Sequence, residues 1–183
     1  AVDHTSGTAI FGEVRYVDRR LQNTTTYRDR SRDFDAEVGF FPRTDIRQIE
    51  NDTSYRRRPE TGPVTSFGPS AVATATYDRA GRLQDWSLQL PFWVNLKGPT
   101  SFYVARNEGY EVYQQRAFRK HSNAVYFSSD KLKWVGVTAY FAQGTGVNYY
   151  PAAGLAPFSA ATTDGNFEVT VRPTSRMRID ETY

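Results

Sequence analysis

The stretch Trp86-Ser-Leu-Gln-Leu-Pro-Phe-Trp-Val-Asn-Leu96 decides the fold class of this chain. Every second residue from Trp86 onward is apolar, whereas Ser87, Gln89 and Asn95 occupy the other phase. Side chains of a strand point alternately to opposite faces, so this pattern predicts one apolar face and one polar, solvated face. Its length matches the roughly 9–11 residues with which a tilted strand crosses a bilayer. Pro91 cannot donate to a ladder and indicates a bulge or a local edge.

The same alternation recurs along the chain and predicts an all-β fold, an antiparallel up-and-down meander of about ten strands. We expect strands at residues 7–16, 21–29, 44–56, 64–77, 83–96, 101–106, 120–128, 133–142, 162–172 and 177–183. Each strand should pair with its sequence neighbours, with almost no helix. The third strand is polar in both phases, so it has to lie above a lipid band or on a solvated edge.

The connections between these strands predict a membrane barrel rather than a sandwich. Short turns are expected at 17–20, 57–63, 97–100, 129–132 and 173–176, and they alternate with 30–43, 78–82, 107–119 and 143–161, three of which are long. Short turns at one end and long loops at the other are the layout of an outer-membrane barrel, with the long loops facing out of the cell. The apolar band predicted to face lipid comprises Leu88, Leu90, Phe92, Val94, Val135, Val137, Ala139, Val169 and Val171.

The amino-acid composition is consistent with strands that have one apolar and one solvated face. Aromatic residues make up 15% of the 183 residues, the net charge is only +3, and no cysteine is present. These values argue against nucleic acid as a partner and exclude a disulfide framework. No signal peptide and no apolar run of about 20 residues is visible, so any membrane contact is made by strands. We interpret residues 1–183 as a single segment of a longer barrel, because an open sheet leaves unpaired edges in lipid.

One segment resembles a known family. Asp33-Phe-Asp-Ala-Glu-Val-Gly-Phe-Phe-Pro-Arg-Thr-Asp-Ile-Arg47, preceded by Tyr27-Arg-Asp29, is similar to a recurrent segment of the DUF5916 family. In that family a carbohydrate-binding domain precedes a C-terminal membrane β-barrel. The resemblance implies a Gram-negative outer-membrane location and little about activity. This chain departs from the pattern at Asp35, where Asn is expected, and it lacks the carbohydrate-binding domain.

The same segment holds the candidate ligand-binding residues Asp33, Asp35, Glu37 and Arg43. Carboxylates at this spacing could hold Ca²⁺, but no glycine-centred calcium loop surrounds them, so a loop closed by its own salt bridges is the favoured interpretation and no metal is predicted.

The candidate lumen-lining residues are Glu13, Arg15, Glu168 and Arg172. They occupy the polar phase of strands whose alternation of apolar and polar residues is clear. Their mixed charges either tune the passage of polar solutes or neutralise one another.

No catalytic residue and no cofactor is predicted. His4 and His121 each lack a second ligand at zinc spacing, and no nucleophile elbow is present. The leading hypothesis is therefore a structural barrel segment that admits a polar solute or binds at the cell surface, with outer-membrane lipid and an oligosaccharide or other polar solute as partners. The alternatives are a soluble carbohydrate-binding β-sandwich and part of a membrane-associated hydrolase whose active site lies elsewhere. The pattern specifies no oligomeric state.

Overall fold

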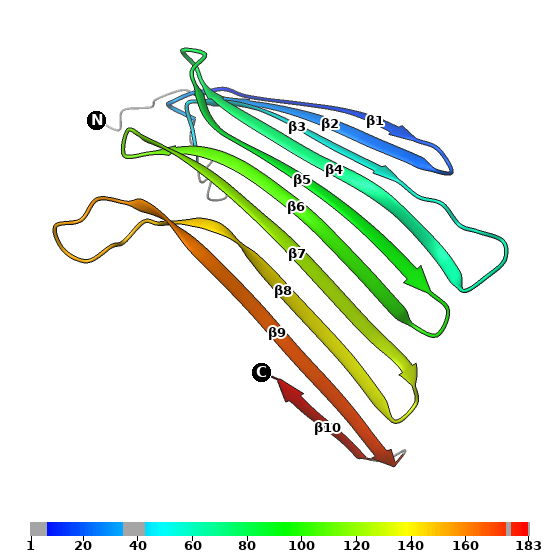
Figure 1. The fold of residues 1–183 in the computed structure, drawn as a ribbon. Helices are drawn as coiled ribbons and strands as arrows, with labels where there is room; N and C mark the ends of the chain where they lie inside the picture. The colour runs from blue at the N-terminus through cyan, green and yellow to red at the C-terminus, as the bar shows by residue number, and fades with distance from the viewer. Residues whose placement is uncertain (1–6, 35–42, 175–176, 183) are drawn as a thin grey trace, which may run out of the picture.

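The computed structural model describes residues 7–34, 43–174 and 177–182, which form one antiparallel sheet (Figure 1). The ten strands are β1 (Ala9–Val17), β2 (Leu21–Arg30), β3 (Ile46–Tyr55), β4 (Val64–Asp78), β5 (Leu83–Leu96), β6 (Thr100–Tyr113), β7 (Arg116–Leu132), β8 (Val135–Asn148), β9 (Phe158–Thr174) and β10 (Met177–Thr182). Their order in the sheet is their order in the sequence. The predicted meander is therefore confirmed. None of the described residues belongs to a helix long and apolar enough to cross a membrane.

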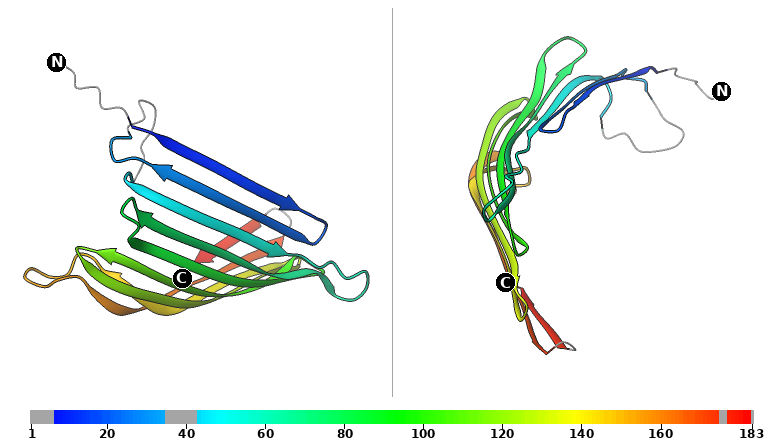
Figure 2. Two further views of the ribbon diagram at one scale, coloured as in Figure 1. Left: turned by 90° about the horizontal axis from the view of Figure 1, so that it is seen from above. Right: turned by 90° about the vertical axis from the view of Figure 1, so that its right-hand side faces the viewer.

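The sheet curves into an open trough, with β1 and β10 at its two margins (Figure 2). We call its two surfaces the concave face and the convex face. The connections after β2, β4, β6 and β8 lie at one end of the strands, here named the loop rim. The connections after β1, β3, β5 and β7 lie at the other end, here named the turn rim.

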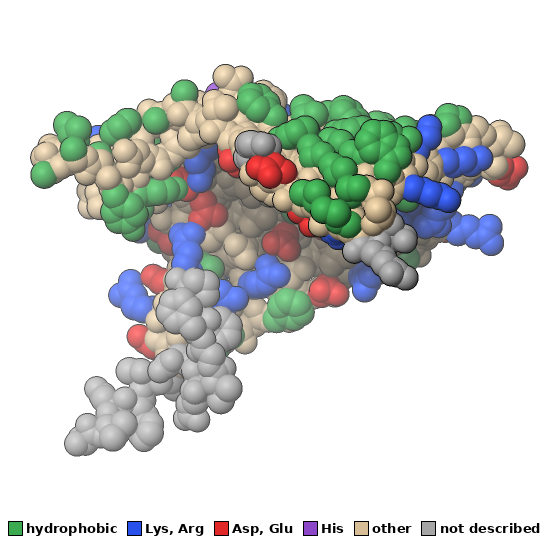
Figure 3. Space-filling view, turned by 90° about the horizontal axis from the view of Figure 1, so that it is seen from below, with side chains coloured by type: hydrophobic (Ala, Val, Ile, Leu, Met, Phe, Trp, Pro, Cys, Tyr) green, Lys and Arg blue, Asp and Glu red, His purple; other side chains and the backbone are tan. Residues whose placement is uncertain are grey.

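The two faces differ in polarity as the alternation predicts. Charged side chains occupy the hollow of the trough, and hydrophobic side chains gather along its outer margin (Figure 3). The strand register places Ser87 and Gln89 on the concave face, opposite Gly109 and Asn107 of β6. The nine residues predicted to face lipid all lie on the opposite phase, and none of them is buried.

Burial is inverted relative to a water-soluble sheet protein. The buried residues are mostly concave-face residues: Thr26, Ile46, Thr76, Ala105, Phe118, Ala124 and Thr170. Large apolar side chains of the convex face remain exposed, for example Leu90 at 44%, Phe127 at 38% and Phe141 at 51%. No second layer covers the convex face within the described residues. The described part of the sheet therefore has no enclosed apolar core.

The apolar residues of the convex face form a band with a clear border. Across β5 to β8, two neighbouring rows are apolar: Phe92, Val104, Val125, Phe141 and Val94, Phe102, Phe127, Ala139. The next row toward the loop rim is Leu90, Arg106, Asn123 and Gln143, so the band ends there on β6 to β8. On β5 it continues to Trp86. The band therefore crosses the strands obliquely.

The polar third strand is held by side-chain hydrogen bonds on both faces. On the convex face Asn23 donates to Thr53 at 2.6 Å and Asn51 donates to Thr25 at 2.8 Å. On the concave face Gln48 donates to fully buried Thr76 at 3.1 Å. These bonds satisfy polar groups that would otherwise destabilise a packed surface. They also interrupt the apolar band at β2 and β3.

Some predicted connections are wrong in length. The long loop expected at residues 107–119 does not exist, because β6 and β7 continue to a two-residue turn at Gln114 and Gln115. Residues 109–113 keep alternating, with Glu111 and Tyr113 in one phase and Tyr110 and Val112 in the other, so the ladder extends. The loop expected at 143–161 is confined to residues 149–157, because β8 and β9 also extend further than expected. The connection expected at 57–63 comprises residues 56–63 and is longer than the other connections at the turn rim.

The β6–β7 turn can be strengthened by substitution. Gln114 and Gln115 have φ values of 47° and 63°, as a type I′ hairpin turn requires. Residues with a Cβ are disfavoured there, whereas Asn-Gly is preferred. We expect Gln114→Asn with Gln115→Gly to raise the free energy of unfolding by about 1 kcal/mol, measured by urea denaturation. Gly81→Ala, at φ 81° in the β4–β5 turn, should lower it. A destabilised Asn-Gly variant would contradict the turn assignment.

Candidate functional site

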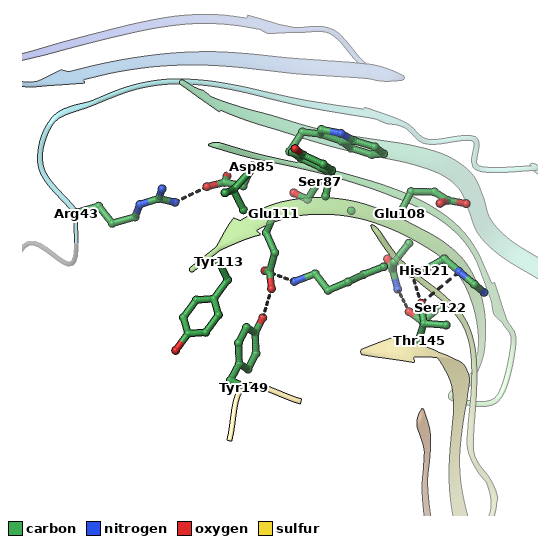
Figure 4. Close-up of a pocket in the computed structure, with 16 residues that line it drawn as sticks. Arg43, Asp85, Ser87, Glu108, Glu111, Tyr113, His121, Ser122, Thr145 and Tyr149 are labelled. Carbon is green, nitrogen blue, oxygen red and sulfur yellow. Dashed lines mark hydrogen bonds and ion pairs between the residues drawn. The ribbon is translucent and has the colours of Figure 1, made fainter. Parts of the chain in front are cut away.

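A hollow of about 810 Å³ opens on the concave face near the loop rim (Figure 4). Its lining comes from β5, β6, β7 and Thr145 of β8, with Arg43 and Tyr149 contributed by the connections. The polar groups in it include Ser87, Asn107 and Ser122, and Asn107 donates to Ser122 at 3.0 Å. It lies where the loop-rim ends of these four strands meet the connection after β8.

Glu111 is the centre of the hydrogen-bond network in this hollow. Its carboxylate accepts from Lys120 Nζ at 2.6 Å and from the Tyr149 hydroxyl. The Tyr149 ring meets Tyr113 edge-on, with centroids 5.1 Å apart. These contacts tie the residues after β8 to the β6–β7 hairpin, although 38 residues separate Glu111 from Tyr149.

Electrostatics at this cluster favour the charged pair. The cluster lies beyond Arg106 and Glu108, where the convex face of β6 is no longer apolar. Partial burial opposes the charge of Glu111, but hydrogen bonds from Lys120 and Tyr149 outweigh it and hold the pKa of Glu111 below its ordinary value. Burial likewise opposes the charge of Lys120, and the bond to Glu111 outweighs it and raises the pKa of Lys120. The bond to Glu111, with burial, raises the pKa of Tyr149.

The predicted ligand-binding residues are only partly described. Arg43 reaches the concave face and forms an ion pair with Asp85 of β5 at the edge of the hollow. Asp33 lies in a turn after β2 and is exposed. Asp35 and Glu37 lie outside the described residues. Of the four, Arg43 is thus the one seen to line the hollow.

The four predicted lumen-lining residues share the concave face. Glu13 and Arg15 lie opposite Thr26 and Thr24 of β2 and are exposed. Glu168 lies opposite Thr138 of β8. Arg172 forms an ion pair with Asp130 at 3.1 Å near the turn rim.

Further ion pairs lie in the same region. Arg178 of β10 pairs with Asp180 at 2.8 Å, and Asp180 also accepts from the Thr170 hydroxyl at 2.6 Å. Arg172, Asp130, Arg178 and Asp180 are therefore neutralised in two pairs.

A separate ion cluster lies on the convex face at the loop rim. The Asp29 side chain is 9% exposed and binds Arg47 Nε at 3.2 Å and Arg79 Nη2 at 2.8 Å. Arg47 belongs to β3 and Arg79 to the β4–β5 turn, so one carboxylate connects three consecutive segments of the sheet.

Two side chains of the hollow that could act as an acid or a base are engaged by neighbouring groups. Glu111 is satisfied by two donors, and His121 contacts Thr145 rather than a carboxylate, with Nδ1 to Oγ1 at 3.3 Å. Within the described ranges, no group of three His, Asp or Glu side chains is placed to hold a metal ion.

The sequence did not predict the network of Glu111, Lys120 and Tyr149. Glu111 and Tyr149 fell in residues 107–119 and 143–161, which were interpreted as loops, and Lys120 was placed at the first position of a strand. The alternation of Asn107, Gly109 and Glu111 was the signal that could have identified Glu111. The chain matches no family model, no curated protein and no solved structure.

Proposed function

We propose that this chain forms part of the wall of a β-barrel in the outer membrane of a Gram-negative bacterium. The convex face would contact lipid and the concave face would line the lumen. Its role would be structural, with a polar solute admitted or bound along the lumen.

The observation that carries this proposal is the inversion of burial. A water-soluble protein rarely leaves a large contiguous apolar patch exposed. Here large apolar side chains on β5 to β9 are exposed on one face, and the buried residues lie mostly on the polar face. Lipid supplies the covering that such a convex face needs, while water in the lumen solvates the concave face.

Strand length and tilt give further support. Strands β4 to β9 contain 14 to 17 residues each, which exceeds the roughly 9–11 residues that a tilted spanning strand needs. The oblique apolar band leaves the loop-rim part of β6 and β7 outside it. In this proposal the hollow around Glu111 therefore lies above the lipid.

The proposal requires that the edges of β1 and β10 pair with further strands. Each of these strands has one neighbour in the sheet. Unpaired backbone N–H and C=O groups are too costly in the hydrocarbon region for an open sheet to span it. A carbohydrate-binding sandwich would instead need a second sheet over the convex face. The resemblance of residues 33–47 to the DUF5916 family supports the location and stays a prediction.

Single-cysteine labelling tests the location and the orientation. The natural chain has no cysteine, so an introduced thiol is labelled uniquely. In a Gram-negative host, the exported chain should fractionate with the outer membrane. A membrane-impermeant maleimide should label Asp33→Cys at the loop rim in intact cells and Lys97→Cys at the turn rim only after permeabilisation.

Each outcome of this experiment is decisive. Labelling of Lys97→Cys but not Asp33→Cys would invert the orientation and remove the hollow from the cell surface. A chain found in the soluble periplasmic fraction, with both cysteines labelled alike, would overturn the barrel.

A further inference from the structure

We propose that the concave face binds a neutral oligosaccharide along a row of four aromatic side chains. The aromatic row consists of Trp93 on β5, Tyr103 on β6, Tyr126 on β7 and Tyr140 on β8. They are direct register partners across four adjacent strands. Neighbouring strands lie about 4.8 Å apart, so the row is roughly 14 Å long. The setting of this site in a lumen rests on the proposed function.

The three tyrosines of the aromatic row are not used by the protein itself, whereas one face of Trp93 contacts the Arg56 guanidinium, 5.2 Å from the ring centroid. All four side chains are half-buried, so each ring is anchored and partly accessible. Elsewhere aromatic rings contact one another, as Phe67 does with Phe92 at 6.3 Å. Within the described part of the chain, the four rings make no such contact with each other, and the hydroxyls of Tyr103, Tyr126 and Tyr140 form no hydrogen bond. Three tyrosine hydroxyls are therefore available to a ligand.

The rows on either side of the aromatic row complete a neutral surface. Toward the loop rim the register partners are Pro91, Ala105, Ala124 and Ala142, and toward the turn rim they are Asn95, Ser101, Ser128 and Thr138. The hydroxyl and amide groups are oriented by one another, since Ser101 donates to Asn95 at 2.8 Å. No charged residue occurs among these twelve positions.

This combination fits a sugar chain better than other solutes. A pyranose ring has an apolar C–H face that can lie on an aromatic ring and a rim of hydroxyls that needs neutral donors and acceptors. Charges of both signs flank the row at its two ends. Arg56 lies over Trp93, with Cζ 5.2 Å from the ring centroid, and Asp164 and Glu168 of β9 are the register partners of Ala142 and Thr138. An anion would meet carboxylates at one end and a cation would meet Arg56 at the other, so a neutral ligand fits the whole row best. A purely apolar ligand would leave the flanking hydroxyls and amides unused.

Fluorescence titration of the chain in detergent micelles tests the site, because Trp93 lies at one end of the row. We expect maltohexaose or cellohexaose to produce a saturable change. The anionic oligogalacturonide of the same length and free indole should produce none. Tyr126→Ala should weaken binding at least about tenfold, since a central aromatic anchor dominates such a contact.

Two further variants separate the roles of ring and hydroxyl from folding. Tyr126→Phe keeps the ring, so we expect a loss of only a few-fold and unchanged folding. Tyr27→Ala makes the matched change on the convex face of β2 and should leave affinity unchanged.

The site and the barrel can fail separately. A membrane-embedded chain that binds no neutral oligosaccharide, or binds it equally well after both Tyr126 substitutions, would overturn the site and leave the barrel standing. Equal affinity for oligogalacturonide or indole would also overturn it. A chain that stays in solution without detergent yet binds the hexasaccharide through Tyr126 would support the site and overturn the barrel.

Discussion

Phe127→Arg should destabilise the chain by about 2–4 kcal/mol in a bilayer, because an arginine near the membrane midplane loses its hydration. Phe127 lies on the convex face in the second apolar row, between Phe102 and Ala139, and is 38% exposed. Urea unfolding of the vesicle-embedded chain, followed by tryptophan fluorescence, measures the change in free energy.

The neighbouring residue provides a matched control. Ser128 belongs to the same strand but lies on the concave face, where it contacts Thr138 with the two hydroxyls 3.4 Å apart. Ser128→Arg should change the free energy of unfolding by less than about 1 kcal/mol, as is usual for a solvated position. If Phe127→Arg is as harmless as Ser128→Arg, the convex face meets water and the membrane proposal is wrong.

Asp29→Asn should destabilise the chain by about 2 kcal/mol, because it weakens two charge-assisted hydrogen bonds at a nearly buried side chain. It also leaves Arg47 and Arg79 close together without the charge that both contact. The two arginines are partly exposed, so the loss should be smaller than for a fully buried ion pair. The same unfolding measurement applies.

An exposed ion pair at the same rim is the control for this substitution. Asp45 contacts Arg32 at 3.3 Å, and the two side chains are 37% and 79% exposed, respectively. Asp45→Asn should therefore cost less than about 0.5 kcal/mol. Equal effects of the two substitutions would show that the Asp29 cluster does not connect β2, β3 and the β4–β5 turn.

Sequence alternation was sufficient to assign the two faces of the sheet, because a strand has a strict period of two. The assignment of Trp86–Leu96 extended correctly to β8 and β9. The end of β6 was not predictable in the same way, because Gln114 and Gln115 are unusual residues for a type I′ turn. A turn without Gly, Asn or Asp carries no local signal, so the composition of residues 107–119 was interpreted as a loop.

The candidate sites depended on information that alternation does not contain. Arg43 could be placed near a rim from sequence, but its ion pair with Asp85 spans 42 residues. The contact between Glu111 and Tyr149 depends on how strongly the sheet curves. The aromatic row depends on register, since Trp93, Tyr103, Tyr126 and Tyr140 align only when each hairpin has its observed length.

The strictly sequential strand order also has a consequence for how such a wall assembles and changes. Because each strand pairs only with the strand before and after it, folding can proceed one hairpin at a time with short loop closures. Inserting or deleting a hairpin would change the pairing partners of only the two strands that flank it. The width of the sheet can therefore change in steps of two strands during evolution, without redesign of the remaining strands.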